Sequence, residues 1–344
     1  MSGPPACYAR HDVAHPPFAG PAVLVTACGT SNSRGALAIL RRHRPDVVRL
    51  GVNSLPAART SAASLCHRFA TVPEGRDPGY RAALGALVER WRPACVIPVH
   101  DAEVEALAAD PLPETVQWTP PLETVRIARD KARFARHLEA AGLPVIPTVT
   151  GDQEAPWPTP WFVKPRVGNG TRGARRIDSP AEAEQLRRAD HVLQPFVEGE
   201  EATVDLLAGE DGRLVAAVCR WRREVRAGIS VVSETFYDSD LRELALRLTD
   251  LLPVRGAANF QAIRDPTAGW RIVELNPRLG SGHPLAHAAG VPIVELLLDW
   301  SMGTSEPARW YDHRPSVRMS RHQEELFLER RGEAWVPRGD GVPH

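Results

Sequence analysis

A lysine followed by several glycines occupies the stretch from Trp161 to Ile177, and this combination of residue types could bind a phosphate group. Lys164 ends a short apolar segment. The loop behind it consists of glycine and polar residues: Gly168, Asn169, Gly170, Thr171, Arg172 and Gly173. Glycine lets backbone N–H groups approach an anion closely, and lysine adds a compact positive charge. An ordinary flexible hairpin has a similar composition, so the loop alone leaves both interpretations open.

Lysine is rare in this chain, which gives weight to the two lysines that it contains. Of the 42 Lys and Arg residues, only Lys131 and Lys164 are lysines. A compact ammonium fits a nucleotide pocket where a planar guanidinium is too bulky. Lys131 follows Asp130, the expected N-cap of a helix that ends at Gly142. Because a lysine in the first turn opposes the helix dipole, an anionic ligand at that helix end would explain it.

A second polar group lies on two apolar segments that we expect to pair as antiparallel strands, Asn259–Ile263 and Trp270–Arg278. Glu274 and Asn276 share one face of their strand, and Gln261 can lie on the same face of the partner. One carboxylate and two amide oxygens form a site that Mg²⁺ accepts when phosphates complete its shell. The alternative is a polar cluster at the solvated end of a hairpin. The apolar neighbours favour a buried strand, where unpaired polar groups are costly.

A break between two further strands provides a third candidate site. The segment from Val192 to Leu207 predicts a strand, an interruption from Pro195 to Gly199, and a second strand. The backbone groups of the interruption could face an adenine edge, and Glu201 could reach a ribose. An ordinary strand-turn-strand with surface acids is the alternative.

The elements that must position these residues follow from the hydrophobic pattern. An apolar segment at residues 22–27 has the character of a buried parallel strand, and a helix follows it. A strand at 46–52, a helix at 80–91 and a strand at 95–99 continue the alternation. This order predicts a small doubly wound, Rossmann-like α/β domain. Its first loop lacks Gly-x-Gly-x-x-Gly, so we assign no dinucleotide site there.

Length and composition exclude several classes of protein. A chain of 344 residues suits two or three lobes, and its formal net charge of zero argues against sequence-independent binding to nucleic acid or acidic membranes. The five cysteines lack a Cys-x-x-Cys pair and are expected to be reduced thiols of a cytoplasmic protein. We expect neither a signal peptide nor a membrane-spanning segment.

Taken in order, these motifs resemble the ATP-grasp superfamily, in particular the carboxylate–amine ligases similar to carbamoyl-phosphate synthetase. The resemblance covers residues 21–300 and rests on four motifs besides the N-terminal domain: Asp130-Lys131, Val163-Lys164-Pro165 with its glycine loop, Gln194 to Glu201, and Glu274 to Arg278. It implies an ATP-grasp fold preceded by the doubly wound domain. The expected boundaries are a tail at 1–20, the doubly wound domain at 21–118, a small lobe at 119–195, a large lobe with the metal site at 196–300, and an extension at 301–344.

The resemblance also implies a role for each matching residue. The residues matched to the ATP phosphates are Lys131, Lys164, Gly168, Gly170, Thr171 and Gly173. Those matched to adenine and ribose are Gln194, Pro195, Val197 and Glu201. Those matched to one or two Mg²⁺ ions, for which Mn²⁺ is an expected substitute, are Gln261, Glu274 and Asn276. Several relatives carry an acid at the position of Gln261, which implies weaker binding of a second ion here.

The implied reaction joins a carboxylate to an amine. The substrate carboxylate attacks the γ-phosphate of ATP, and an amine attacks the resulting acyl phosphate to give an amide, ADP and phosphate. Lys164 and Arg278 would stabilise the developing charge, and the closed glycine loop would exclude water. We expect an amino acid as the acid and a small amine or amino acid as its partner, in a specialised biosynthetic pathway. A homodimer is compatible with the resemblance, which does not fix the oligomeric state.

The substrate-binding residues are the least defined part of the site. Arg278 is expected to face the activated carboxylate. Arg226, in the basic stretch Arg222–Ser230, is a second candidate for binding a substrate carboxylate, and a solvated charge run is the alternative.

Two other functions remain open at this point. A carboxylase-like enzyme that uses bicarbonate would usually need a carrier, and the sequence contains no biotin-carrier segment. A non-catalytic ATP sensor would be favoured by degenerate metal positions, whereas Glu274, Asn276 and Arg278 are all present.

Overall fold

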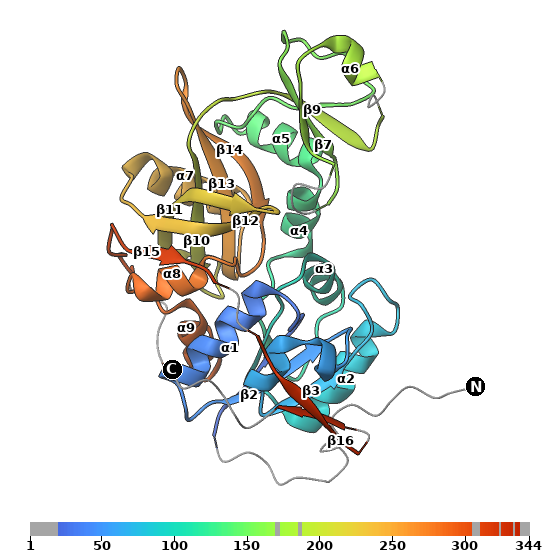
Figure 1. Ribbon diagram of the computed structural model, residues 1–344. Helices are drawn as coiled ribbons and strands as arrows, with labels where there is room; N and C mark the ends of the chain where they lie inside the picture. The colour runs from blue at the N-terminus through green and yellow to red at the C-terminus, as the bar shows by residue number, and fades with distance from the viewer. Residues whose placement is uncertain are drawn as a thin grey trace, which may run out of the picture. The chain divides into compact units, whose positions relative to one another are not determined.

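The computed structural model describes residues 20–168, 173–184, 188–304, 310–322, 325–332 and 334–337, and these form a mixed α/β structure (Figure 1). The chain divides into two compact units. The first contains Met1–Trp118, Val294–Glu306 and His322–His344. The second contains Thr119–Ile293 and Pro307–Arg321. All the residues predicted to bind a ligand or metal belong to the second unit.

The first unit is built on a parallel sheet with the strand order β3-β2-β1-β4-β5. The strands are β1 (Ala22–Val25), β2 (Val48–Asn53), β3 (Arg68–Thr71), β4 (Cys95–Ile97) and β5 (Val116–Gln117). Its helical segments are α1 (Ser31–His43), η1 (Ala57–Arg59), η2 (Ser61–Leu65), α2 (Tyr80–Trp91), α3 (Asp101–Ala109) and most of α9 (Ile293–Ser301). The hairpin β16 (Leu328–Arg331) and β17 (Ala334–Pro337) also belongs to it. The predicted helix at 80–91 is confirmed.

The second unit begins with two helices and a small antiparallel sheet. The helices are α4 (Leu122–Arg129) and α5 (Lys131–Ala140), and the short α6 (Pro180–Glu184) follows later. The sheet has the order β6-β9-β7-β8, with β6 (Val149–Thr150), β7 (Trp161–Pro165), β8 (Arg175–Ile177) and β9 (His191–Pro195). The Asp130 carboxylate accepts from the backbone N–H groups of Ala132 and Arg133, both at 3.1 Å, which confirms the predicted N-cap.

A larger antiparallel sheet with the order β14-β13-β10-β11-β12-β15 forms the centre of the second unit. Its strands are β10 (Glu201–Ala208), β11 (Leu214–Arg226), β12 (Ile229–Thr235), β13 (Gly256–Asp265), β14 (Gly269–Asn276) and β15 (Arg318–Ser320). The helices α7 (Ser239–Leu251) and α8 (His283–Ala288) complete the unit. Strand β15 comes from the segment expected to be a C-terminal extension, so part of that segment belongs to the central sheet.

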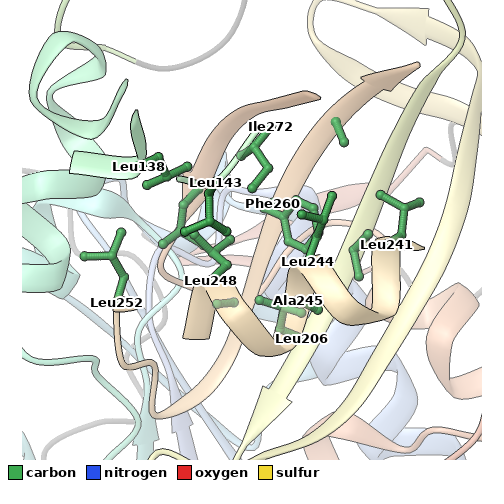
Figure 2. Packing of buried hydrophobic residues seen from close by; sticks show 14 of the residues in the cluster. Leu138, Leu143, Leu206, Leu241, Leu244, Ala245, Leu248, Leu252, Phe260 and Ile272 are labelled. Carbon is green, nitrogen blue, oxygen red and sulfur yellow. The ribbon is translucent and has the colours of Figure 1, made fainter. Parts of the chain in front are cut away.

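One face of the large sheet is apolar because alternate residues of each strand point to the same side. Figure 2 shows Leu241, Leu244 and Leu248 of α7 against Leu206 and Phe260 of the sheet, all in one buried cluster. The intervening residues point to the opposite face, and toward the site end of the strands they include polar or charged residues: Thr203, Asp205, Arg220, Gln261 and Glu274. We call this the polar face of the large sheet.

Among the described residues, no helix combines the length and apolar character that a membrane crossing requires.

Candidate functional site

Lys164 is a buried lysine in the middle of the small sheet. It lies on β7, pairs with Val192 of β9, and is only 6% exposed. Burial lowers the pKa of Lys164 to about 8, and the carboxylate of Glu274 opposes this shift. The charge of Lys131 lowers the pKa further and that of Glu201 raises it. The two lysines predicted to bind phosphate and two of the predicted site carboxylates therefore lie close enough to act on one another electrostatically.

Lys131 contacts the first residue of the glycine loop. Its Nζ donates a 2.9 Å hydrogen bond to the carbonyl oxygen of Gly168. The adjacent Asp130 carboxylate forms a 2.6 Å ion pair with Arg166, which fixes the entry to the loop against the start of α5. Gly168 has φ = 140° and Gly173 has φ = 74°, so both ends of the loop adopt a conformation that glycine accepts without strain. The intervening predicted residues, including Gly170 and Thr171, lie outside the described residues.

The predicted adenine segment leaves the small sheet at the end of β9. Gln194 is buried and donates from Nε2 to the hydroxyl of Thr148 at 2.8 Å. Pro195 pairs with Trp161 in the sheet, and the half-buried Val197 follows outside the strand. Glu201 is the first residue of β10, where its carboxylate accepts from Arg222 at 3.0 Å. These residues thus follow the connection from the small sheet to the large one.

The three predicted metal-binding side chains surround one carboxylate on the polar face. Gln261 and Glu274 are register partners on β13 and β14, which confirms the predicted pairing. Gln261 Nε2 donates to Glu274 Oε1 at 2.8 Å, and Asn276 Nδ2 donates to the same oxygen at 3.1 Å. Rotating either amide by 180° would exchange its nitrogen and oxygen and present an oxygen beside the Glu274 carboxylate. For Asn276 this rotation would also end the hydrogen bond that its Oδ1 accepts from Arg278.

This donor set fits a hard cation that receives further oxygens from a ligand. One carboxylate and two amides are too few to enclose an ion, and Mg²⁺ commonly completes its octahedral shell with phosphates and water. Within the described ranges, no group of three or more His, Cys, Asp or Glu side chains is placed to hold a metal. A cation here would therefore depend on amide and ligand oxygens.

Arg278 lies directly behind the metal-binding candidates. Its Nη2 donates to Asn276 Oδ1 at 3.2 Å, and its carbonyl oxygen accepts from Asn259 Nδ2 at 3.2 Å. The two contacts tie the start of the following loop to the end of β14 and to the first part of β13. The predicted Arg226 lies elsewhere, at the exposed end of β11, where it pairs with Glu224 at 2.8 Å and its side chain is 76% exposed.

The structure also places buried charges on the polar face that the sequence interpretation missed. Arg220 of β11 forms a 2.6 Å ion pair with Asp205 of β10. The interpretation began the basic stretch at Arg222, although the alternation of Arg220 with the apolar Cys219 and Trp221 was available as a signal. Recognising Asp205 as the partner required the register of β10 against β11, in which Arg220 stands opposite Thr203.

Comparison with known proteins yields one family and several relatives. A family described as "ATP-grasp in the biosynthetic pathway with Ter operon" matches residues 187–325. The 3-methyl-D-ornithine--L-lysine ligase of Methanosarcina acetivorans is 30% identical over 179 residues, which cover 51% of this chain and 47% of the ligase. The chain thus spans about half the length of the curated relatives of this kind.

Solved structures share the fold at low sequence identity. The biotin carboxylase domain of the Hydrogenobacter thermophilus 2-oxoglutarate carboxylase, in complex with MgADP, ADP and bicarbonate, has a TM-score of 0.69 at 15% identity. The similarity covers 88% of this chain and 74% of that one. An L-amino acid ligase from Bacillus licheniformis has a TM-score of 0.64 at 16% identity, covering 86% and 78%.

Proposed function

We propose that this chain is an ATP-grasp enzyme and, within that superfamily, an ATP-dependent carboxylate–amine ligase that forms an amide or peptide bond; the family match over residues 187–325 and the similarity to the Methanosarcina ligase support this. The observation that carries this proposal is the charge arrangement around Lys164. A buried ammonium, a second lysine that contacts the glycine loop from the start of α5, and the Glu274 carboxylate with its two amides occur together in one unit. Such a set can bind a polyphosphate and its cation at the same time.

We assign the residues to the following steps of the reaction. Lys131 and Lys164 hold the ATP phosphates, and the glycine loop covers them. Glu274, Gln261 and Asn276 hold one or two Mg²⁺ ions, which supply neutralising charge at the phosphates when bound. The substrate carboxylate attacks the γ-phosphate while Lys164 and Arg278 stabilise the charge that develops there. The amine then displaces phosphate from the acyl phosphate.

The substrate class and the remaining assignments belong to the same proposal. We propose amino-acid substrates because the matched relatives in Methanosarcina are named as ligases of two amino acids. Gln194, Pro195 and Val197 bind the adenine edge, and Glu201 binds the ribose. We also propose that residues 21–118 form a doubly wound domain, consistent with the parallel strand order β3-β2-β1-β4-β5. The domain boundaries, substitution by Mn²⁺ and a homodimeric state remain predictions.

The proposal is tested by phosphate release from Mg²⁺-ATP against amino acids supplied singly and in pairs. We expect release that requires one particular pair and is lost in Lys164→Ala. Hydroxylamine added with the acid alone should trap the acyl phosphate as a hydroxamate, and the product should be identified by mass spectrometry. ATP binding without release for any acid or pair would contradict the proposal in favour of an ATP sensor. Release that depends on bicarbonate would favour a carboxylase-like enzyme.

A further inference from the structure

A buried ion pair lies on the polar face of the large sheet, next to the metal-binding candidates. Arg220 Nε lies 2.6 Å from Asp205 Oδ2, and the two side chains are 4% and 2% exposed. Gly282 packs directly on this pair, because a Cβ there would lie 2.1 Å from Arg220 Nε. Arg220 is therefore held in place by its strand, its carboxylate partner and the chain that follows Arg278.

A second guanidinium shares this environment, and among the residues that the structure describes no carboxylate forms an ion pair with it. Arg321, directly after β15, donates from Nε to the carbonyl oxygen of Ser230 at 3.1 Å and from Nη2 to that of Ser281. Burial lowers the pKa of Arg321, the charge of Arg220 lowers it further, and Asp205 opposes the shift. The two arginines thus share the single negative charge of Asp205. Arg321 is half-buried, and a partly desolvated positive charge without a counterion of its own is unfavourable, so the carboxylate of a ligand would offset it.

An unpartnered hydroxyl on the neighbouring strand points to the same ligand. Thr203 is 1% exposed, and its Oγ1 has no hydrogen-bond partner within the described part of the chain. It stands opposite Arg220 on β11 and opposite Gln261 on β13, between the arginines and the metal-binding candidates. Because a buried hydroxyl without a partner is unfavourable, a bound polar group would satisfy it.

The arginines and the metal-binding candidates lie in one row on the polar face. Glu274, Gln261, Thr203 and Arg220 form one row across four neighbouring strands. With about 4.8 Å between strands, Arg220 stands roughly 14 Å along the sheet from Glu274. This separation leaves room for a cation and a phosphoryl group at the Glu274 end of the row and for an amino acid between them and the arginines, with its amine toward Arg278 and its carboxylate toward Arg321.

We propose that Arg321, supported by Arg220, Asp205 and Thr203, binds a carboxylate of the amine substrate. This inference rests on the proposed ligase function and deepens it. The amine substrate is then an amino acid, and the product is a peptide-like compound with a free carboxylate. Arg321 contacts that carboxylate, and Arg220 is a positioning residue that adds positive charge behind it.

The test compares amine substrates with and without the carboxylate. ADP release is measured with the acid held constant, and each common L-amino acid is compared with its primary amide as the amine. We expect the preferred amino acid to exceed its amide by about 100-fold or more in kcat/KM, because a charged hydrogen-bonding site rejects an analogue that leaves it unpaired. Arg321→Gln should raise KM for the amino acid by about 10- to 100-fold with little change in kcat, and leave the amide unaffected.

Two further variants separate this role from a structural one. Arg321→Lys retains the charge and should recover part of the affinity for the amino acid. Arg318→Gln is the matched control, since Arg318 lies on β15, pairs with Glu234 and is largely exposed. It should behave as the wild-type protein does. Equal kcat/KM for amides and free amino acids in the wild-type protein would overturn the inference. An equal loss of kcat/KM for both kinds of amine in Arg321→Gln would overturn it as well.

A binding measurement distinguishes failure of this inference from failure of the ligase function. The same amino acids and amides are titrated calorimetrically into the protein in the presence of MgADP, with Arg321→Gln alongside. Tighter binding of a free amino acid than of its amide, lost in the variant, would support the subsite even if no pair yields ADP. If the protein binds each free amino acid no more tightly than its amide, the carboxylate subsite is overturned even if the ligase reaction occurs.

Discussion

The two faces of the large sheet are built from the same strands and have opposite chemistry. On β10 and β13, Leu206 and Phe260 belong to the apolar cluster under α7, whereas Asp205 and Gln261 are on the polar face. The apolar face gains stability from buried surface and close packing. The polar face carries buried charges whose desolvation opposes folding. Neighbouring residues of one strand point to opposite faces, so residues that stabilise the unit alternate with residues that are available for chemistry.

The largest effect that we expect on the polar face is loss of activity in Glu274→Gln. The substitution removes the carboxylate that lies closest to the two amides and that favours the charged form of Lys164. We expect phosphate release to fall by about 10³-fold or more, equivalent to about 4 kcal/mol of transition-state stabilisation. Chemical denaturation should show a free energy of unfolding within about 1 kcal/mol of wild type. If Glu274→Gln instead lowered the free energy of unfolding strongly while its folded fraction kept wild-type phosphate release, the distinction between the two faces would be wrong.

On the apolar face, Phe260→Ala should act on stability instead. Phe260 is fully buried in the cluster under α7, and its removal leaves a cavity that the neighbouring leucines fill only in part (Figure 2). We expect a loss of about 3–5 kcal/mol in the free energy of unfolding, measured by urea denaturation. Phe260→Leu, the milder control, should cost less. The KM for ATP, measured on the fraction that remains folded, should be unchanged; a large increase would show that the two faces are coupled.

A smaller effect, about tenfold per pH unit, is expected in ATP binding at alkaline pH. Burial lowers the pKa of Lys164 from 10.5 to about 8, so half of the ammonium is present near pH 8, nearly all of it well below this pH, and it is progressively lost above it. Because a phosphate binds the ammonium form, the Kd for ATP should rise by up to about tenfold per unit above pH 8. The linked effect on folding has the opposite sign: the depressed pKa disfavours the fold below pH 8, and this penalty declines as the pH rises toward 10.5.

Titration of ATP between pH 6.5 and 9.5 measures this dependence. Lys164→Met is the control, since it has no ammonium to titrate: it should bind ATP more weakly at every pH, and its affinity should not follow this transition. An equal pH dependence in both proteins would show that another group is responsible.

Much of the fold was predictable because its signals are local. The helix at 80–91, the Asp130 cap and the pairing of Gln261 with Glu274 follow from periodicity, capping residues and a short hairpin connection, and the structure has all three. The resemblance to the ATP-grasp superfamily was also recognisable from short motifs in order. The role of the segment after residue 301 was not, because β15 pairs with β12 across more than 80 residues of intervening sequence.

The sequence by itself determined which residues are suited to bind a ligand or metal: two lysines in a chain otherwise rich in arginine, glycines after one of them, and Glu274 with its amides. Those features depend on residue type and short spacing. Tertiary structure decided which charges are buried and which meet. Arg220 and Arg226 are both arginines of β11, yet one is fixed against Asp205 and the other is exposed beside Glu224. That difference arises from strand register, the path of the chain at Gly282 and the approach of Arg321, all of which depend on contacts between residues distant in sequence.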